Sequence, residues 1–310
     1  MRIILIGLLM GLAELFPGVS GGTIAFVSGI YHRMVANIVR LIPSSLVQLP
    51  KLGVFRWWRQ YDLGFMFSLF GGMAISIFIF SNVVEFLLIN QKIGIFAFFF
   101  GLIFSAVTVL CKQISSFNLL NVGMILLGVS STLLLTHFSF PEFFGMSPIS
   151  FFIAGSVAVV AWILPGVSGS LALLSFGLYP SVIKALTDLN WSLLAPLAGG
   201  SLFGVYFFAN AIRSLLIRFP NSTFSFLVGL MLGSLKTVWP WQITISYQIT
   251  PEGAQYPIFL EPVSPLIYSE YTGSDPQFLT ALLAFFVGII VLLLLDRLNS
   301  LANDSFENND

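Results

Sequence analysis

Charged residues are scarce in this 310-residue chain: only 8% of the residues are Asp, Glu, Lys or Arg, whereas 57% are apolar. The mean hydropathy of +0.97, together with recurring apolar runs of roughly 18 or more residues, excludes a soluble domain and a disordered chain. The 13 basic and 13 acidic residues balance, so the net charge gives no reason to expect nucleic acid as a partner. The sequence therefore predicts a polytopic protein whose main partner is the membrane bilayer.

Cysteine is almost absent. The single Cys111 excludes an intrachain disulfide and a metal site built from cysteines, and we expect neither a metal nor another cofactor. The apolar stretch after Arg2 has the look of a signal peptide, but no small-x-small cleavage motif follows it. Because the same block recurs later in the chain, we expect this first segment to belong to the mature structure.

One motif that combines proline with glycine occurs twice in the chain. Pro-Gly-Val-Ser-Gly occupies 17–21 and again 165–169, each time inside an apolar segment. Gly29-Ile30-Tyr31 follows the first copy as Gly177-Leu178-Tyr179 follows the second. Proline and glycine interrupt helices, and interrupted backbone at membrane depth persists only where protein or a polar cavity satisfies it. Two such breaks in corresponding positions are typical of the binding site of a transporter.

Other glycines extend the repeat. Gly71-Gly72 matches Gly199-Gly200, and Gly101-Leu102 matches Gly229-Leu230 at the same offset. We predict an all-α polytopic membrane protein with two inverted repeats, 1–140 and 141–310, each a re-entrant helical hairpin plus three transmembrane helices. The predicted hairpins are 2–38 (arms 2–15 and 19–38) and 149–186 (arms 149–163 and 167–186), the transmembrane helices are 62–88, 93–111, 119–138, 192–216, 222–238 and 277–296, and an outer loop covers 239–276.

The Lys and Arg distribution distinguishes re-entrant hairpins from crossing segments. With hairpins, each half crosses the membrane three times, which inverts the second half, and ten of the 13 basic residues lie on the cytoplasmic side. That division follows the positive-inside rule. With crossing segments the best division is eight to five. We therefore expect hairpins, with both termini in the cytoplasm and the loop 239–276 outside.

The duplicated motif predicts an anion site. A glycine-rich turn that opens a helix exposes successive backbone N–H groups, and the helix dipole adds positive potential there. Such a nest binds an oxyanion without a cationic side chain, and inverted repeats would bring both tips to one phosphate. The predicted donors are Gly18, Val19, Ser20, Gly21, Gly22 and Thr23, with Gly166, Val167, Ser168, Gly169 and Ser170. The alternative is that these small residues only let helices pack closely.

Glu14 lies three residues before the first break, and an ionisable side chain in an apolar segment indicates a functional role. Burial favours the neutral form of a carboxyl group, so Glu14 is a candidate for coupling transport to protons. The second half has Trp162 at this position, so only one copy can titrate. Alternatively, Glu14 lies at the aqueous mouth of the hairpin and caps the second arm.

Three further polar residues are secondary candidates. Asn82 and Asn210 occupy equivalent positions, where they either line the cavity or join helices by hydrogen bonds. Arg213 stands where the first half has Glu85. It either attracts anionic lipid headgroups at the inner leaflet or anchors its helix at the interface.

Residues 14–23, Glu-Leu-Phe-Pro-Gly-Val-Ser-Gly-Gly-Thr, followed by Gly29-Ile30-Tyr31, resemble the bacterial polyprenyl-phosphate transporter family of the PopT type, and the similarity covers nearly the whole chain. The resemblance implies an inner-membrane protein that returns undecaprenyl phosphate, the lipid carrier of peptidoglycan precursors, from the outer to the cytoplasmic leaflet. In that family an acidic residue, commonly Asp, stands where this chain has Glu14. The sequence carries no signal for an oligomeric state.

Two other functions fit parts of the pattern. A transporter or channel for a small anion would use the same nest, but it would need a water-lined pore and no lateral opening. An intramembrane polyprenyl-pyrophosphate phosphatase also places Glu, Pro and Ser in inverted hairpins, and its chemistry needs a nucleophile, a base and a cation around the phosphate. Ser20 and Glu14 are present, but no His or Arg accompanies the motifs. The lipid transporter, which is not an enzyme, is therefore favoured.

Overall fold

The structure, a computed structural model, describes residues 2–16, 18–41, 51, 53–137, 147–249 and 255–307, so Pro17 lies outside the described residues. The prediction of a predominantly helical protein is confirmed. Contacts group the chain into two compact units, Met1–Asn82 with Phe140–Thr223, and Val83–Ser139 with Phe224–Asp310. Each unit combines segments from both predicted repeats. The predicted boundary between the repeats at residue 140 therefore describes the two sequence halves, not the two units, and stays a prediction.

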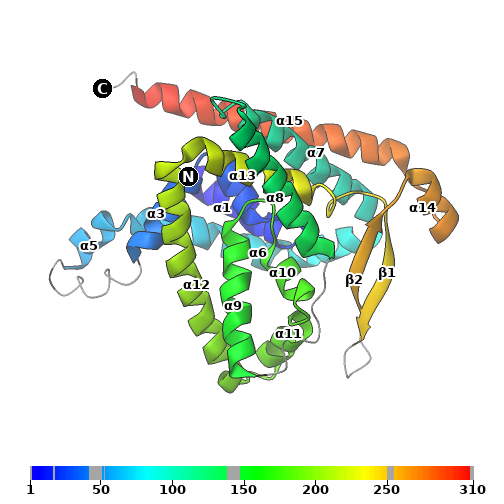
Figure 1. Ribbon diagram of the computed structural model, residues 1–310, viewed down its shortest axis with the longest axis horizontal. Helices are drawn as coiled ribbons and strands as arrows, with labels where there is room; N and C mark the ends of the chain where they lie inside the picture. Colours follow the sequence, from blue (N-terminus) through cyan, green and yellow to red (C-terminus); the bar gives the residue numbers. More distant parts are fainter. Residues whose placement is uncertain are drawn as a thin grey trace. The chain divides into compact units, whose positions relative to one another are not determined.

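The first unit contains both glycine-rich motifs. Its helices are α1 (Arg2–Glu14), α2 (Gly21–Val27), α3 (Tyr31–Leu41), α5 (Val54–Gln60), most of α6 (Leu63–Asn90), α9 (Pro148–Ile163), α10 (Gly169–Ser175), α11 (Tyr179–Thr187) and α12 (Trp191–Arg218) (Figure 1). The second unit holds α7 (Lys92–Cys111), α8 (Leu119–His137), most of α13 (Pro220–Ser234), β1 (Gln242–Ile249), β2 (Gln255–Pro262), α14 (Pro265–Thr272) and α15 (Phe278–Glu307).

The long helices make this a multi-pass membrane protein. Among the described residues, five helices are long and apolar enough to cross a bilayer, namely α6, α7, α8, α12 and α15, and α10 with α11 would make a sixth. These five lie where the sequence predicts crossings. The predicted crossing at 222–238 corresponds to α13, which has 15 residues and falls short of the ~20 that a spanning helix needs.

The second arm of each predicted hairpin is two helices, and the prediction of continuous arms over 19–38 and 167–186 is wrong. Just beyond the ends of α2 and α10 lies a glycine with left-handed backbone, Gly29 (φ 72°) and Gly177 (φ 67°). At both sites the N–H groups of the glycine and of the next residue bond back to helix carbonyls, as Ile30 N does to Ala25 O at 3.1 Å. This Schellman arrangement ends a helix, and α11 leaves α10 at 112°.

Glycines set the closest helix contacts. α1 meets α6 where a Cβ on Gly72 would lie 2.5 Å from the carbonyl oxygen of Ile4. At the equivalent place α9 packs along α12 (Figure 1), and a Cβ on Gly200 would overlap the carbonyl oxygen of Phe152. In the second unit, Gly101 of α7 lies against Phe285 of α15 in the same way. Small residues let helix backbones approach in membranes, so one glycine of each repeated Gly-Gly pair corresponds to a backbone contact, Gly72 in the first half and Gly200 in the second.

An ion pair ties α3 to the start of α6. The Arg33 guanidinium donates to both Asp62 carboxylate oxygens at 2.7 and 2.9 Å, and the Asn37 amide donates to the same carboxylate at 3.0 Å. The Arg33 hydrogen bond holds the pKa of Asp62 below its usual range. The guanidinium also lies 4.3 Å from the centre of the Phe65 ring. Because α3 packs on α12 as well, the end of the first hairpin is fixed to two long helices.

The predicted outer loop 239–276 contains structure that the sequence analysis did not predict. β1 and β2 form an antiparallel pair with an irregular register at Ser246, and α14 follows. Two indole N–H groups fasten the segment at its base, since Trp239 donates to Val263 O and Trp241 to Pro276 O, both at 2.8 Å. The alternation of apolar and polar residues in 242–249 is the signal that could have revealed a strand.

Gly200→Ala is expected to destabilise the packing of α9 on α12, because its methyl group would overlap backbone rather than a side chain that can move. Thermal unfolding of the purified protein in detergent should show a loss of about 1–3 kcal/mol or a failure to fold. The matched control is Gly199→Ala, whose Cβ would lie 3.9 Å from the Phe152 ring and should change stability little. Equal behaviour of the two variants would contradict the packing described here.

Candidate functional site

The two glycine-rich motifs touch each other in the first unit. The backbone N–H of Gly166 donates to the Thr23 hydroxyl at 2.9 Å, and this hydrogen bond is buried between residues 143 positions apart. A Cβ on Gly22 would lie 2.9 Å from the carbonyl oxygen of Trp162, so the backbones approach closely there as well. The turn before α2 and the turn before α10 thus form one continuous feature.

Both turns have the same backbone shape. Gly18 and Gly166 adopt φ 83° and 84°, a left-handed conformation that glycine tolerates. Val19 and Val167 are buried, and their N–H groups close the turns onto Phe16 O and Leu164 O. The extended serines that follow, Ser20 and Ser168, are the N-caps of α2 and α10. The sequence repeat is therefore also a repeat of local conformation.

The serines of the two turns make different hydrogen bonds. Ser20 is buried, and its hydroxyl accepts the Gly22 N–H at 3.2 Å. Within the described residues, Ser168 makes no such capping bond, and its hydroxyl lies 2.8 Å from that of Ser170. Gly169 packs against α9, where a Cβ would lie 2.7 Å from Ala158 O. In the first turn the serine hydroxyl bonds an N–H group at the start of its own helix. In the second turn the two serine hydroxyl groups pair with each other.

Glu14 lies at the centre of this feature. Its carboxylate accepts the Gly21 N–H at 2.6 Å, so it caps the second arm, as one alternative reading of the sequence expected. The Trp162 side chain lies beside the same carboxyl group, and its ring stacks on Phe70 with 6.1 Å between ring centres. The residue that replaces the acid in the second repeat is thus a neighbour of the acid in the first.

These contacts define what the first turn offers an anion. The Gly21 N–H is held by the Glu14 carboxyl group, and the Gly22 N–H is held by the Ser20 hydroxyl. Helix starts bind carboxyl groups for the same reason that they bind phosphates. Both of these donors of the first turn are therefore already bonded within the protein.

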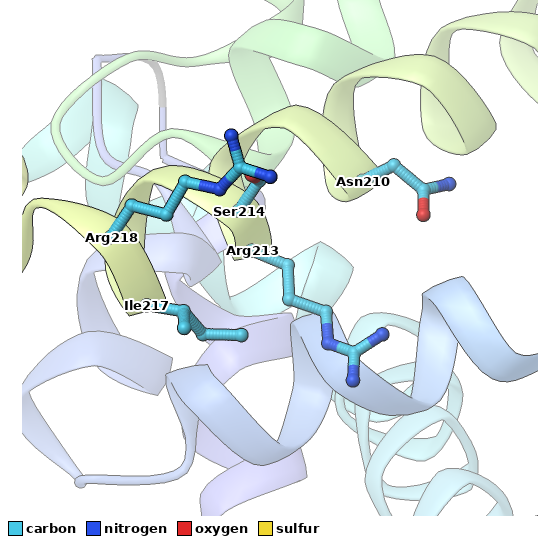
Figure 2. A pocket seen from close by; sticks show the side chains of 5 residues that line it. All are labelled: Asn210, Arg213, Ser214, Ile217 and Arg218. Carbon is cyan, nitrogen blue, oxygen red and sulfur yellow. The ribbon is translucent and has the colours of Figure 1, made fainter.

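The secondary candidates lie elsewhere on the long helices. Asn82 is exposed on α6, and the Asn210 amide donates to Tyr206 O of its own helix at 2.6 Å. Arg213 lines a cavity of about 330 Å³ at the end of α12. The other lining residues are Asn210, Ser214, Ile217 and Arg218 (Figure 2). Sequence reasoning did not single out Ser214 or Arg218, although their spacing puts them on the same helix face as Asn210.

The fold and this site define a class: a multi-pass membrane protein in which two interrupted helical segments meet through their glycine-rich turns. The undecaprenyl phosphate translocase-like family matches residues 10–256 of the chain, and the chain belongs to this family. The family expected from the sequence is thereby confirmed. No solved structure matches the chain significantly.

Two relatives support this membership. A protein of Vibrio cholerae serotype O1, named polyprenyl-phosphate transporter, is 34% identical over 291 residues, which are 94% of each chain. A Staphylococcus aureus protein of the same name is 32% identical over 254 residues, 76% of this chain and 85% of the relative. Both relatives are named as transporters rather than as enzymes.

Thr23→Val should separate the two turns, because valine has nearly the same shape but cannot accept the Gly166 N–H. A buried N–H left without an acceptor costs about 1–3 kcal/mol, and thermal unfolding in detergent should register that loss. Thr23→Ser keeps the hydroxyl and is expected to retain most of the stability. Wild-type stability in the valine variant would show that the hydrogen bond does not hold the turns together.

Proposed function

We propose that this protein transports a polyprenyl phosphate across the membrane and that the two joined turns hold its phosphate. The observation that carries the proposal is the buried hydrogen bond from Gly166 to Thr23, in a chain whose relatives are named polyprenyl-phosphate transporters. A phosphate needs several N–H or O–H donors, and two helix starts with adjacent hydroxyl groups supply them. The isoprenoid tail would remain among lipid-facing side chains.

Glu14 acts in this proposal as an internal competitor of the phosphate. Its carboxylate holds Gly21 N–H at 2.6 Å, the donor that the phosphate would use. A protonated carboxyl group is a weaker acceptor than a carboxylate, so protonation would release this donor. Phosphate binding and proton uptake by Glu14 would then be linked. The side chain of Trp162, from the segment before the second turn, lies beside the same carboxyl group.

The proposed direction of transport is the one that the family resemblance implies. We place the chain in the bacterial inner membrane as two inverted repeats with re-entrant hairpins and both termini in the cytoplasm. The excess of Lys and Arg on that side supports this orientation. The lipid would return from the outer to the cytoplasmic leaflet, where synthesis of peptidoglycan precursors uses it again. Each turn would face one side of the membrane.

Replacing Ser20 and Ser168 together by alanine should abolish lipid return, because both turns lose a hydroxyl group at the proposed phosphate site. The measurement is outer-leaflet undecaprenyl phosphate in cells depleted of other transporters of this lipid, with each variant shown to be inserted. The matched control is Ser130→Ala/Ser131→Ala, which removes two exposed hydroxyl groups bonded to their own helix. If inserted wild-type protein leaves the lipid outside, the proposal is wrong.

Glu14→Gln should remove the part of the pH dependence of transport that Glu14 contributes, because glutamine can accept the Gly21 N–H but cannot exchange a proton. The rate of polyprenyl phosphate movement between leaflets of proteoliposomes, measured across pH 5–8, is expected to vary more steeply for wild type than for the variant, which keeps only the titration of the substrate phosphate near pH ~6. If the transport rates of both proteins were independent of pH, protonation of Glu14 would not be coupled to transport. A variant with the wild-type slope would assign the titrating group elsewhere.

A further inference from the structure

The cavity at the end of α12 has a composition unlike that of the joined turns. Two of its five lining residues are arginines, Arg213 and Arg218, and Ser214 adds a hydroxyl group between them. No carboxylate lines it in the described part of the chain, so the lining carries two positive charges. Figure 2 shows Arg218 folding back toward Ser214 while Arg213 points away from α12, so the guanidinium groups do not stack. Both remain available to an anion.

The position of the cavity suits the headgroup of a lipid. α12 is a 28-residue helix that is long and apolar enough to span a bilayer, and the cavity lies in its last three turns. Arginines at the end of a spanning helix lie at headgroup level. The apolar neighbours Ile217 and Phe219 are 68% and 60% exposed, so an alkyl chain has an apolar surface beside the charges.

The first repeat lacks this cluster. α6 and α12 have the same length and the same glycine landmarks, and Asn82 of α6 corresponds to Asn210. At the positions of Arg213 and Arg218, however, α6 has Glu85 and Asn90. With inverted repeats these two helix ends lie on opposite sides of the membrane, and the positive-inside rule favours arginines at the cytoplasmic end. The pair of arginines is therefore present on one side of the membrane only.

We propose that Arg213, Ser214 and Arg218 form a second binding site for the phosphate of the transported lipid, separate from the joined turns. Its ligand is a phosphate monoester on a long isoprenoid chain. A monoester carries about −1.5 to −2 charge near pH 7 and matches two arginines, whereas the phosphodiester of a bulk phospholipid carries one charge. The site would receive or release the headgroup at one membrane face. This inference rests on the proposed function.

The test is lipid binding to purified full-length protein in detergent, measured by native mass spectrometry. The probes are C55 polyprenyl monophosphate and phosphatidylglycerol, titrated separately. Arg213→Ala/Arg218→Ala should weaken monophosphate binding about tenfold or more, since charge-assisted hydrogen bonds are lost, and should change phosphatidylglycerol binding little. Arg213→Lys/Arg218→Lys should recover part of the affinity. The matched control, Arg56→Ala/Arg59→Ala, removes two exposed arginines of α5 and should bind as wild type does.

Each other outcome has a definite meaning. An equal loss for both lipids would assign the arginines to phospholipid headgroups in general and overturn the monoester site. Unchanged monophosphate binding in the alanine variant would also overturn the second site. If that variant transports polyprenyl phosphate as wild type does, the proposed function stays intact. If wild-type protein neither binds nor moves polyprenyl phosphate, the proposed function fails and this inference fails with it. Arg213 is half-buried and Arg218 is exposed, so the variants are expected to fold as wild type does. Unfolding temperatures equal to that of wild type would exclude misfolding as the cause of weaker binding.

Discussion

The junction of the two glycine-rich turns depends on the hydrogen bond between the Gly166 N–H and the Thr23 hydroxyl. It joins two turns that the chain builds separately, and it is buried where water cannot replace it. Glu14 and Trp162 add a second contact, since the carboxyl group caps α2 and lies beside the indole. A helix end in an apolar setting needs such partners for its N–H groups. The same groups that stabilise the two breaks therefore constitute the candidate site.

Glycine backbone contacts make this meeting possible. Gly72 lets α1 lie against α6, and Gly200 lets α9 lie against α12 at the equivalent place. The left-handed Gly29 and Gly177 end α2 and α10 early, which turns α3 and α11 away. The chain thus uses small residues for two different purposes: close helix packing and helix termination.

Much of this could be predicted from the sequence, because apolar length and repeated glycines are strong local signals. The long helices, the duplicated turns and Trp162 opposite Glu14 all follow from them. The sequence shows Gly29 as part of a repeat. That a helix ends there depends on the left-handed backbone φ of this glycine, which the repeat alone does not reveal. The contacts of Thr23 with Gly166 and of Glu14 with Gly21 could not be predicted, since they depend on tertiary packing. The strands at 242–262 were missed because the segment was treated as a loop.

The most direct test of the central claim is to map where a polyprenyl monophosphate with a photoreactive headgroup attaches to the purified protein. Mass spectrometry of the cross-linked peptides would identify the residues next to the phosphate. The account predicts labelling of both turns, within residues 18–23 and 166–170, and loss of that labelling when unlabelled polyprenyl monophosphate is in excess. Labelling that avoids both turns, or that persists under competition, would contradict a phosphate site at their junction.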